Sequence, residues 1–275
     1  MNIKEFIKTA LEEDVGTGDI TTLTTIPADR EAHGKFLAKE SGVLCGVDVA
    51  KEVFSTVDPT VEFIPFFKDG DKINKGDIIA EVKGKAQSVL TAERTALNIM
   101  QRLSGIAKRT SEACEAVKGT KAVIADTRKT TPCMRVLEKY AVRCGGGSNH
   151  RFNLADGILI KDNHIAAAGS ITAAVKSARK NAPHTLKIEV EVEDMDMLKE
   201  ALDAGADIIM LDNMSNEEMA KAAAFVNGRA LLEASGNMGE KDLLEVAKTG
   251  VDIISIGALT HTVKAMDISL KFKLK

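Results

Sequence analysis

Residues 186–214 read LKIEVEVEDMDMLKEALDAGADIIMLDNM, and this stretch decides the fold class. Two apolar runs of strand length, 186–192 and 206–212, enclose a segment with the apolar spacing of an amphipathic helix. Asp194 stands where that helix is expected to begin, and Gly205 stands where it is expected to end. A strand–helix–strand unit of this size predicts two parallel strands joined by a right-handed crossover.

The same unit repeats on both sides of this stretch. Four further apolar runs of strand length occur, at 122–126, 157–162, 230–236 and 251–257. Helical patterns fill most of the gaps, and Ser215 with Glu218 forms a capping-box pattern before a helix that Gly228 ends. The last spacings, about 20 to 23 residues, suit the repeat of an α/β barrel. We therefore predict a barrel with six recognisable strands instead of eight.

The N-terminal part of the chain carries a different pattern. An amphipathic helix is predicted over 1–16, and short strands are predicted within 33–46, 61–71 and 77–84. Residues 87–118 have helical periodicity, and Gly105 is expected to break or kink this segment into two helices. We place the domain boundary at 118/119, with the barrel over 119–264.

Composition narrows the class of protein. Of the 275 residues, 44% are hydrophobic and 28% are charged, which favours a folded chain with a sizeable core. The net charge of −3, the single Tyr and the absence of Trp argue against nucleic-acid binding. No apolar stretch reaches the ~18 residues of a membrane span, and the N-terminus lacks a signal-peptide pattern. Four scattered cysteines without a C-x-x-C pair favour free thiols and a cytoplasmic location over a zinc site.

Polar side chains stand at the carboxyl end of almost every predicted strand. In a parallel barrel these ends meet at one mouth, where catalytic groups gather. Within IEVEVE, the residues Glu189, Glu191 and Glu193 share one face of the strand. Because helices cover the outer face of a barrel, the valines between them should point outward and the glutamates inward. Buried carboxylates need cationic partners or a metal ion.

Cations are concentrated between Asp126 and His164, where seven Lys or Arg stand against four Asp or Glu. Three of them, Arg135, Lys139 and Arg143, recur every four residues on a helix predicted to begin at 131–132, so a solvated face explains them equally well. The others lie in loops or at strand ends, where they serve either as structural ion pairs or as ligand groups: Arg128, Lys129, Arg151 and Lys161.

A mouth with cations on one side and carboxylates on the other suits a polyanionic ligand that brings a divalent cation. Two short segments, Ser235–Gly236 and Ile256–Gly257–Ala258, follow the last two strands. Barrels often bind a phosphate through backbone N–H groups at that place.

Several motifs together resemble the quinolinate phosphoribosyltransferase family over nearly the whole chain. They include DTRKTTPCMRVLEKYAVRCGGGSNHRFNLADGILIKDNHI at 126–165, GADIIMLDNM at 205–214, LEASGNM at 232–238 and GVDIISIGALTH at 250–261. The resemblance implies transfer of a phosphoribosyl group from phosphoribosyl pyrophosphate to quinolinate with loss of carbon dioxide, a step of NAD biosynthesis. It also implies an open, incomplete α/β barrel of the TIM-like class with a smaller N-terminal α/β sandwich domain, to which residues 265–275 return.

The resemblance further implies a homodimer with shared active sites and a set of site residues. Quinolinate would be held by Arg94 from the partner subunit and by Thr127, Arg128, Lys129, His150, Arg151 and Lys161. Phosphoribosyl pyrophosphate would contact Lys129, Lys161, Glu191, Asp212, Ser235, Gly236, Asn237, Ile256, Gly257 and Ala258. The catalytic residues would be Lys129, Lys161, Glu191 and Asp212, and the last two would also hold Mg²⁺, directly or through water.

The sequence leads to one further prediction each for Arg94 and Cys133. Arg94 falls close to the apolar stripe of its helix, so it should have an anionic partner or lie at an interface. Cys133 stands where the family usually has Gly, and a positive φ there would cost about 1 kcal/mol or more. We expect Cys133 to be the second residue of a helix, where cysteine is acceptable.

Three alternatives stay open at this point. A paralogue of the same fold associated with molybdenum uptake would share the architecture. An aldolase could use Lys161 as a Schiff-base amine. A non-catalytic anion-binding protein would bind the same ligands without turnover.

Overall fold

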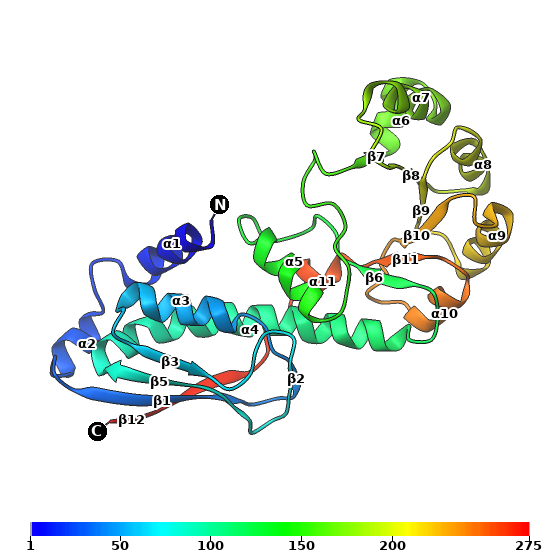
Figure 1. The fold of residues 1–275 in the computed structure, drawn as a ribbon. Coiled ribbons are helices and arrows are strands. Elements are labelled where there is room, and N and C mark those ends of the chain that lie inside the picture. The colour runs from blue at the N-terminus through cyan, green and yellow to red at the C-terminus, as the bar shows by residue number, and fades with distance from the viewer. Residues whose placement is uncertain (1, 275) are drawn as a thin grey trace. The chain divides into compact units, whose positions relative to one another are not determined.

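The structure is a computed structural model that describes residues 2–274, and it consists of two compact units (Figure 1). The first unit contains the residues up to Ser111, Pro132–Gly146 and the residues from Val263 on. The second unit contains Glu112–Thr131 and Gly147–Thr262. Neither unit is one continuous stretch of sequence, and the boundary at 118/119 stays a prediction. None of the helices within residues 2–274 has the length and apolarity that crossing a bilayer requires.

The first unit is built around an antiparallel sheet in the order β12-β1-β5-β3. Its strands are β1 (Glu31–Ala38), β3 (Glu62–Pro65), β5 (Ile78–Lys85) and β12 (Ile268–Leu274). A small pair joins β2 (Gly42–Val43) to β4 (Lys72–Ile73). Alternate residues of β1 are buried, as expected for a strand with one face on a core.

Five helices belong wholly or mainly to this unit: α1 (Ile3–Val15), α2 (Ile20–Thr25), α3 (Val47–Val57), α4 (Ala86–Ala116) and α5 (Arg135–Cys144). The predicted helix at the N-terminus is confirmed, and Asn2 with Glu5 forms its capping box. The aromatic core joins sheet to helix: the ring centroid of Phe36 lies 5.9 Å from that of Phe54 and 5.6 Å from that of Phe63.

Helix α4 runs without interruption, so the predicted break at Gly105 is wrong. A Cβ atom built on Gly105 would lie 2.2 Å from the carbonyl oxygen of Lys264. Glycine therefore allows the C-terminal segment to pass close to the helix, and it marks a packing contact instead of a kink.

The predicted start of α5 at 131–132 is also wrong, because this helix begins at Arg135. Cys133 lies before the helix with a φ of +66°, in the left-handed region. The expectation that cysteine is acceptable there as a helical residue is therefore corrected. Lys139 on α5 is fully buried whereas Arg143 is exposed, so the three cations of this helix do not form a single solvated face.

The second unit contains all six predicted strands in one parallel sheet, in the order β6-β11-β10-β9-β8-β7. They are β6 (Val123–Ala125), β7 (Ile158–Ile160), β8 (Ile188–Val192), β9 (Ile208–Asp212), β10 (Leu231–Ser235) and β11 (Ile253–Ser255). Among the described residues β6 and β7 do not pair with each other, so the barrel is open.

One or two helices follow each strand from β7 to β11, and Figure 1 shows α7 to α10 along the outer side of the sheet. They are α6 (Asp162–Ala168), α7 (Ile171–Asn181), α8 (Met195–Asp203), α9 (Asn216–Val226), α10 (Leu243–Lys248) and α11 (Ala258–His261). Both predicted caps are confirmed. Asp194 accepts hydrogen bonds from the first turn of α8, and Ser215 and Glu218 form the capping box of α9.

Candidate active site

A cavity of about 420 Å³ lies at the carboxyl ends of the strands of the second unit. We call it the mouth cavity. Its lining includes every residue of this unit predicted to hold quinolinate, together with the two predicted metal ligands. The lining residues are Thr127, Arg128, Lys129, His150, Arg151, Leu159, Lys161, Glu191, Met210, Asp212, Glu233, Ser235 and Ser255.

The strand β8 directs its glutamates inward, as its alternation predicts. Val190 and Val192 are fully buried, while Glu191 lines the mouth cavity and Glu189 lines a second cavity at the amino ends of the strands. Glu193 lies beyond the end of the strand and is exposed, so its predicted inward position is wrong. The expected cationic partner of Glu191 is Lys161, which forms an ion pair with it.

The segment 148–151 takes the place of a strand at the open edge of the barrel. Ser148 forms a parallel bridge to Ala125 on β6. The carboxylate of Asp126, which is fully buried, accepts hydrogen bonds from Asn149 Nδ2 at 2.6 Å and from the backbone N–H of His150 at 2.9 Å. These contacts place His150 and Arg151 in the lining of the mouth cavity. No apolar pattern in the sequence marks this segment as a strand.

Two guanidinium groups stand close together in the mouth cavity. Burial lowers the pKa of Arg151, and the positive charge of Arg128 lowers it further, while Glu189 acts in the opposite direction. Arg151 also donates a hydrogen bond from Nη1 to the carbonyl oxygen of Gly157 at 3.2 Å. Neighbouring guanidinium groups repel each other, so an anion that bridges them is favoured.

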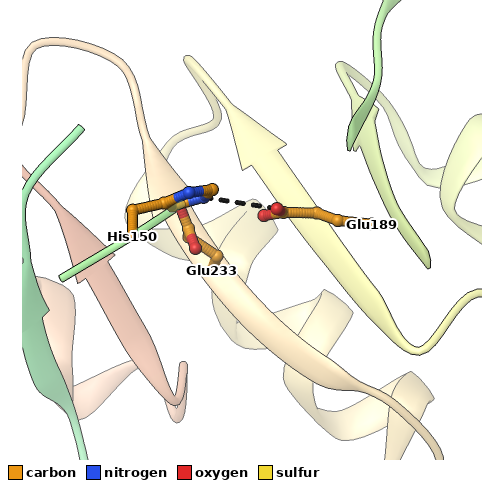
Figure 2. Close-up of side chains that lie close together, drawn as sticks. All are labelled: His150, Glu189 and Glu233. Atoms are coloured by element: carbon orange, nitrogen blue, oxygen red, sulfur yellow. Dashed lines mark ion pairs between the residues drawn. The ribbon is translucent and has the colours of Figure 1, made fainter. Parts of the chain in front are cut away.

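His150, Glu189 and Glu233 form a cluster in which both carboxylates are buried and His150 is half-buried (Figure 2). His150 and Glu233 also line the mouth cavity. The Nε2 atom of His150 lies 3.2 Å from Oε2 of Glu189 and 3.6 Å from Oε1 of Glu233. Burial, followed by the neighbouring charge of Glu189, raises the pKa of Glu233 to about 7. The three residues offer ligand atoms that all lie within 4.8 Å of one another, a spacing that a metal ion could also use.

This cluster was not predicted as a unit. The alternation of IEVEVE indicates that Glu189 points inward, and Glu233 is visible as a carboxylate within the apolar run at 230–236. A charged residue inside a run that must be buried is the signal that could have identified Glu233 as part of the site.

The end of β10 requires glycine, and the end of β11 leaves little room for a larger residue. Gly236 has a φ of +93°, and a Cβ atom there would lie 2.2 Å from Oδ1 of Asn213. At Gly257 a Cβ atom would lie 3.1 Å from the side chain of Lys129. Of the two segments predicted to hold phosphate, only Ser235 lines the mouth cavity. The residues outside its lining are Gly236, Asn237, Ile256, Gly257 and Ala258.

Arg94 lies on α4 in the first unit and is exposed. Among the residues that the structure describes, Arg94 forms no ion pair, although its charge lowers the pKa of the adjacent Glu93 against the larger opposite effect of burial. Its place at an interface stays a prediction.

Comparisons with known proteins agree across the chain. Residues 19–104 match the family description "Quinolinate phosphoribosyl transferase, N-terminal domain", and residues 106–271 match "Quinolinate phosphoribosyl transferase, C-terminal domain". A probable nicotinate-nucleotide pyrophosphorylase (carboxylating) of Bacillus subtilis is 46% identical over 100% of this chain and 94% of that protein. The nicotinate-nucleotide pyrophosphorylase of Ehrlichia chaffeensis superposes with a TM-score of 0.95 at 40% identity, covering 99% of both chains. NadC of Streptococcus pyogenes gives 0.93 at 45% identity, covering 99% of this chain and 97% of that one.

Proposed function

The chain belongs to the quinolinate phosphoribosyltransferase family, and from this premise we propose how its own residues perform the reaction. It is a phosphoribosyltransferase that transfers the phosphoribosyl group to quinolinate with loss of carbon dioxide, in the biosynthesis of NAD. The observation that carries the residue assignments is the composition of the mouth cavity. Arg128, Arg151 and Lys161 lie in the same cavity as the carboxylates of Glu191 and Asp212.

Quinolinate carries two carboxylates, and the cationic side of the mouth cavity suits both of them. We assign one carboxylate to the guanidinium groups of Arg128 and Arg151, since a planar fork matches a carboxylate. Lys161 and Lys129 provide further positive charge, and Thr127 and His150 complete the wall.

Phosphoribosyl pyrophosphate is assigned to the remaining side of the cavity. We assign its 5′-phosphate to Ser235–Gly236–Asn237 and Ile256–Gly257–Ala258, because barrels often bind a phosphate where their last two strands end. Glu191 and Asp212 line the cavity with carboxylate oxygens, the ligand type that Mg²⁺ prefers, so the donor set fits this ion. When bound, Mg²⁺ would neutralise charge on the pyrophosphate. Asn213 orients Asp212 through a hydrogen bond of 2.8 Å from Nδ2.

The chemistry then follows from positioning. The quinolinate nitrogen attacks the anomeric carbon of the ribose while pyrophosphate leaves, and the ring nitrogen becomes cationic. That positive charge stabilises the electron pair left on the adjacent ring carbon when its carboxylate departs as carbon dioxide. The cations of the cavity hold together two anionic substrates that would otherwise repel each other.

The homodimer and the role of Arg94 are also part of this proposal. The exposure of Arg94 and the family resemblance support them. In a two-fold dimer each subunit would lend its Arg94 to the site of the other.

The test compares Lys161→Ala with Lys176→Ala, an exposed lysine on α7 as a matched control. With quinolinate labelled in the carboxylate that is lost, release of labelled carbon dioxide should fall by about 10²-fold or more in the first variant. It should stay unchanged in the second. Lys161→Ala with near-normal turnover and an unchanged unfolding curve would contradict the role of Lys161.

None of the three alternatives has an observation in its favour, and release of labelled carbon dioxide in the test above would exclude a protein that only binds anions. Relatives that are 46% and 44% identical over nearly the whole chain are named as probable nicotinate-nucleotide pyrophosphorylases, which disfavours a molybdenum-uptake paralogue. A Schiff-base amine must be unpaired and desolvated, whereas Lys161 is paired with Glu191.

A further inference from the structure

The mouth cavity contains one carboxyl group that the roles above do not use. Glu233 on β10 is 1% exposed, yet it lines both the mouth cavity and the second cavity behind it. Among the described residues, its buried Oε1 atom has no hydrogen-bond partner. Such a position favours the neutral form of a carboxyl group, because burying its charge is costly.

The reaction needs a proton at this place. When carbon dioxide leaves, the electron pair of the broken bond remains on the ring carbon next to the nitrogen, and a proton must replace the lost carboxylate. The donor has to lie on the side of the cavity that holds the quinolinate ring. It also needs a proton that it holds near neutral pH but can still give up.

Lys161, His150 and the arginines of the cavity wall are less suitable, and Lys129 is assigned to the substrates as a positive charge. Lys161 is held by Glu191 in an ion pair. His150 uses both ring nitrogens, since Nδ1 accepts the N–H of Arg151 at 2.8 Å and the hydrogen on Nε2 is directed at Glu189 at 3.2 Å. The guanidinium groups do not give up protons in proteins.

The surroundings of Glu233 favour its protonated form. It faces the carboxylate of Glu189 on β8, the ring of His150 from the segment 148–151, and the hydroxyl of Ser255 on β11. Burial has the largest effect on its pKa and raises it, Glu189 raises it further, and His150 and Ser255 act in the opposite direction. The result is an acid with a proton to give near neutral pH.

We propose that Glu233 is the acid that protonates the ring carbon after carbon dioxide has left; this rests on the proposed function above. The bond between the ring carbon and the carboxylate carbon breaks, and its electron pair stays on the ring. A new C–H bond forms with the proton of Glu233, which becomes a carboxylate. Repulsion between the charges of Glu189 and Glu233 then favours recovery of a proton from water.

The experiment is a single-turnover reaction in which pyrophosphate, quinolinate mononucleotide and nicotinate mononucleotide are measured separately. Glu233→Gln removes the acid and keeps the shape, and Glu217→Gln on the exposed face of α9 is the matched control. In Glu233→Gln, pyrophosphate should still form within a few-fold of the wild-type rate. Without the donor, the electron pair on the ring can recombine with carbon dioxide before it meets a proton. Nicotinate mononucleotide should therefore form about 10²-fold more slowly, and the undecarboxylated nucleotide should accumulate. Glu233→Asp should recover part of the rate.

The other outcomes of this experiment would contradict either the role of Glu233 or the proposed function. Equal loss of both products, or no loss of either, would overturn the role of Glu233. Absence of pyrophosphate from the wild type would instead contradict the proposed function. A stoichiometric transition metal in the wild type that disappears in Glu233→Gln would replace the proton donor by a metal site at His150, Glu189 and Glu233.

A second measurement does not depend on the folding of the variant. In the wild type, the rate of product formation after pyrophosphate release should fall as the pH rises through about 7, as the donor loses its proton. A rate that is constant between pH about 6 and about 9 would overturn the proposal.

Discussion

Replacement of Cys133 by glycine should stabilise the protein, because the structure places this residue at a φ of +66°. A residue with a Cβ atom in the left-handed region is destabilised by about 1–2 kcal/mol. Glycine avoids this penalty but makes the unfolded chain more flexible, which costs about 0.4–1 kcal/mol. We therefore expect Cys133→Gly to raise the free energy of unfolding by about 0.5–1 kcal/mol.

The matched control is Cys133→Ala, which removes the thiol and keeps the Cβ atom. It should leave the free energy of unfolding unchanged to within about 0.5 kcal/mol, since Cys133 is exposed. Urea unfolding followed by circular dichroism measures both variants, and the midpoint should shift only for Cys133→Gly. Equal stabilisation by alanine and glycine would refute the backbone argument. Both variants should keep wild-type turnover, because the reaction uses no thiol.

Four further outcomes are expected. Gly105→Ala should destabilise the protein by about 3 kcal/mol in urea unfolding, because the added Cβ atom would lie 2.2 Å from the carbonyl oxygen of Lys264. Nicotinate, which lacks the carboxylate that is lost, should have a kcat/KM about 10²-fold or more below that of quinolinate in a coupled pyrophosphate assay. Arg94→Ala and Lys161→Ala should each be inactive alone. After subunit exchange half of the dimers should contain both variants, and one of their two sites would have both residues intact. The mixture should therefore recover roughly a quarter of the wild-type activity per site. The pKa of Glu233 is raised on folding, so its contribution to stability is complete below about 4.5 and is lost as the pH rises through about 7. Over that range the free energy of unfolding of the wild type should fall relative to that of Glu233→Gln.

The local sequence pattern was sufficient to predict much of the barrel. All six strands lie where the apolar runs predict them, and the caps of α8 and α9 are formed by the expected residues. The inward direction of Glu189 and Glu191 also followed from the alternation of β8. These features depend on side chains within a few positions of one another, so the order of residues alone determines them.

Contacts between distant parts of the chain determined the features that the local pattern did not predict. Gly105 stands within the continuous helix α4 because Lys264, far along the chain, passes too close for a Cβ atom. The conformation of Cys133 follows from where α5 begins, which no local cap signal marked correctly.

The cluster of His150, Glu189 and Glu233 also depends on contacts between distant parts of the chain. His150 reaches Glu189 and Glu233 because Ser148 pairs with β6 and carries the following residues along the open edge of the barrel. Periodicity reports which face of an element is buried, but not which other element lies against that face. The raised pKa of Glu233 comes from desolvation and from a charge on another strand, so it exists only in the folded chain.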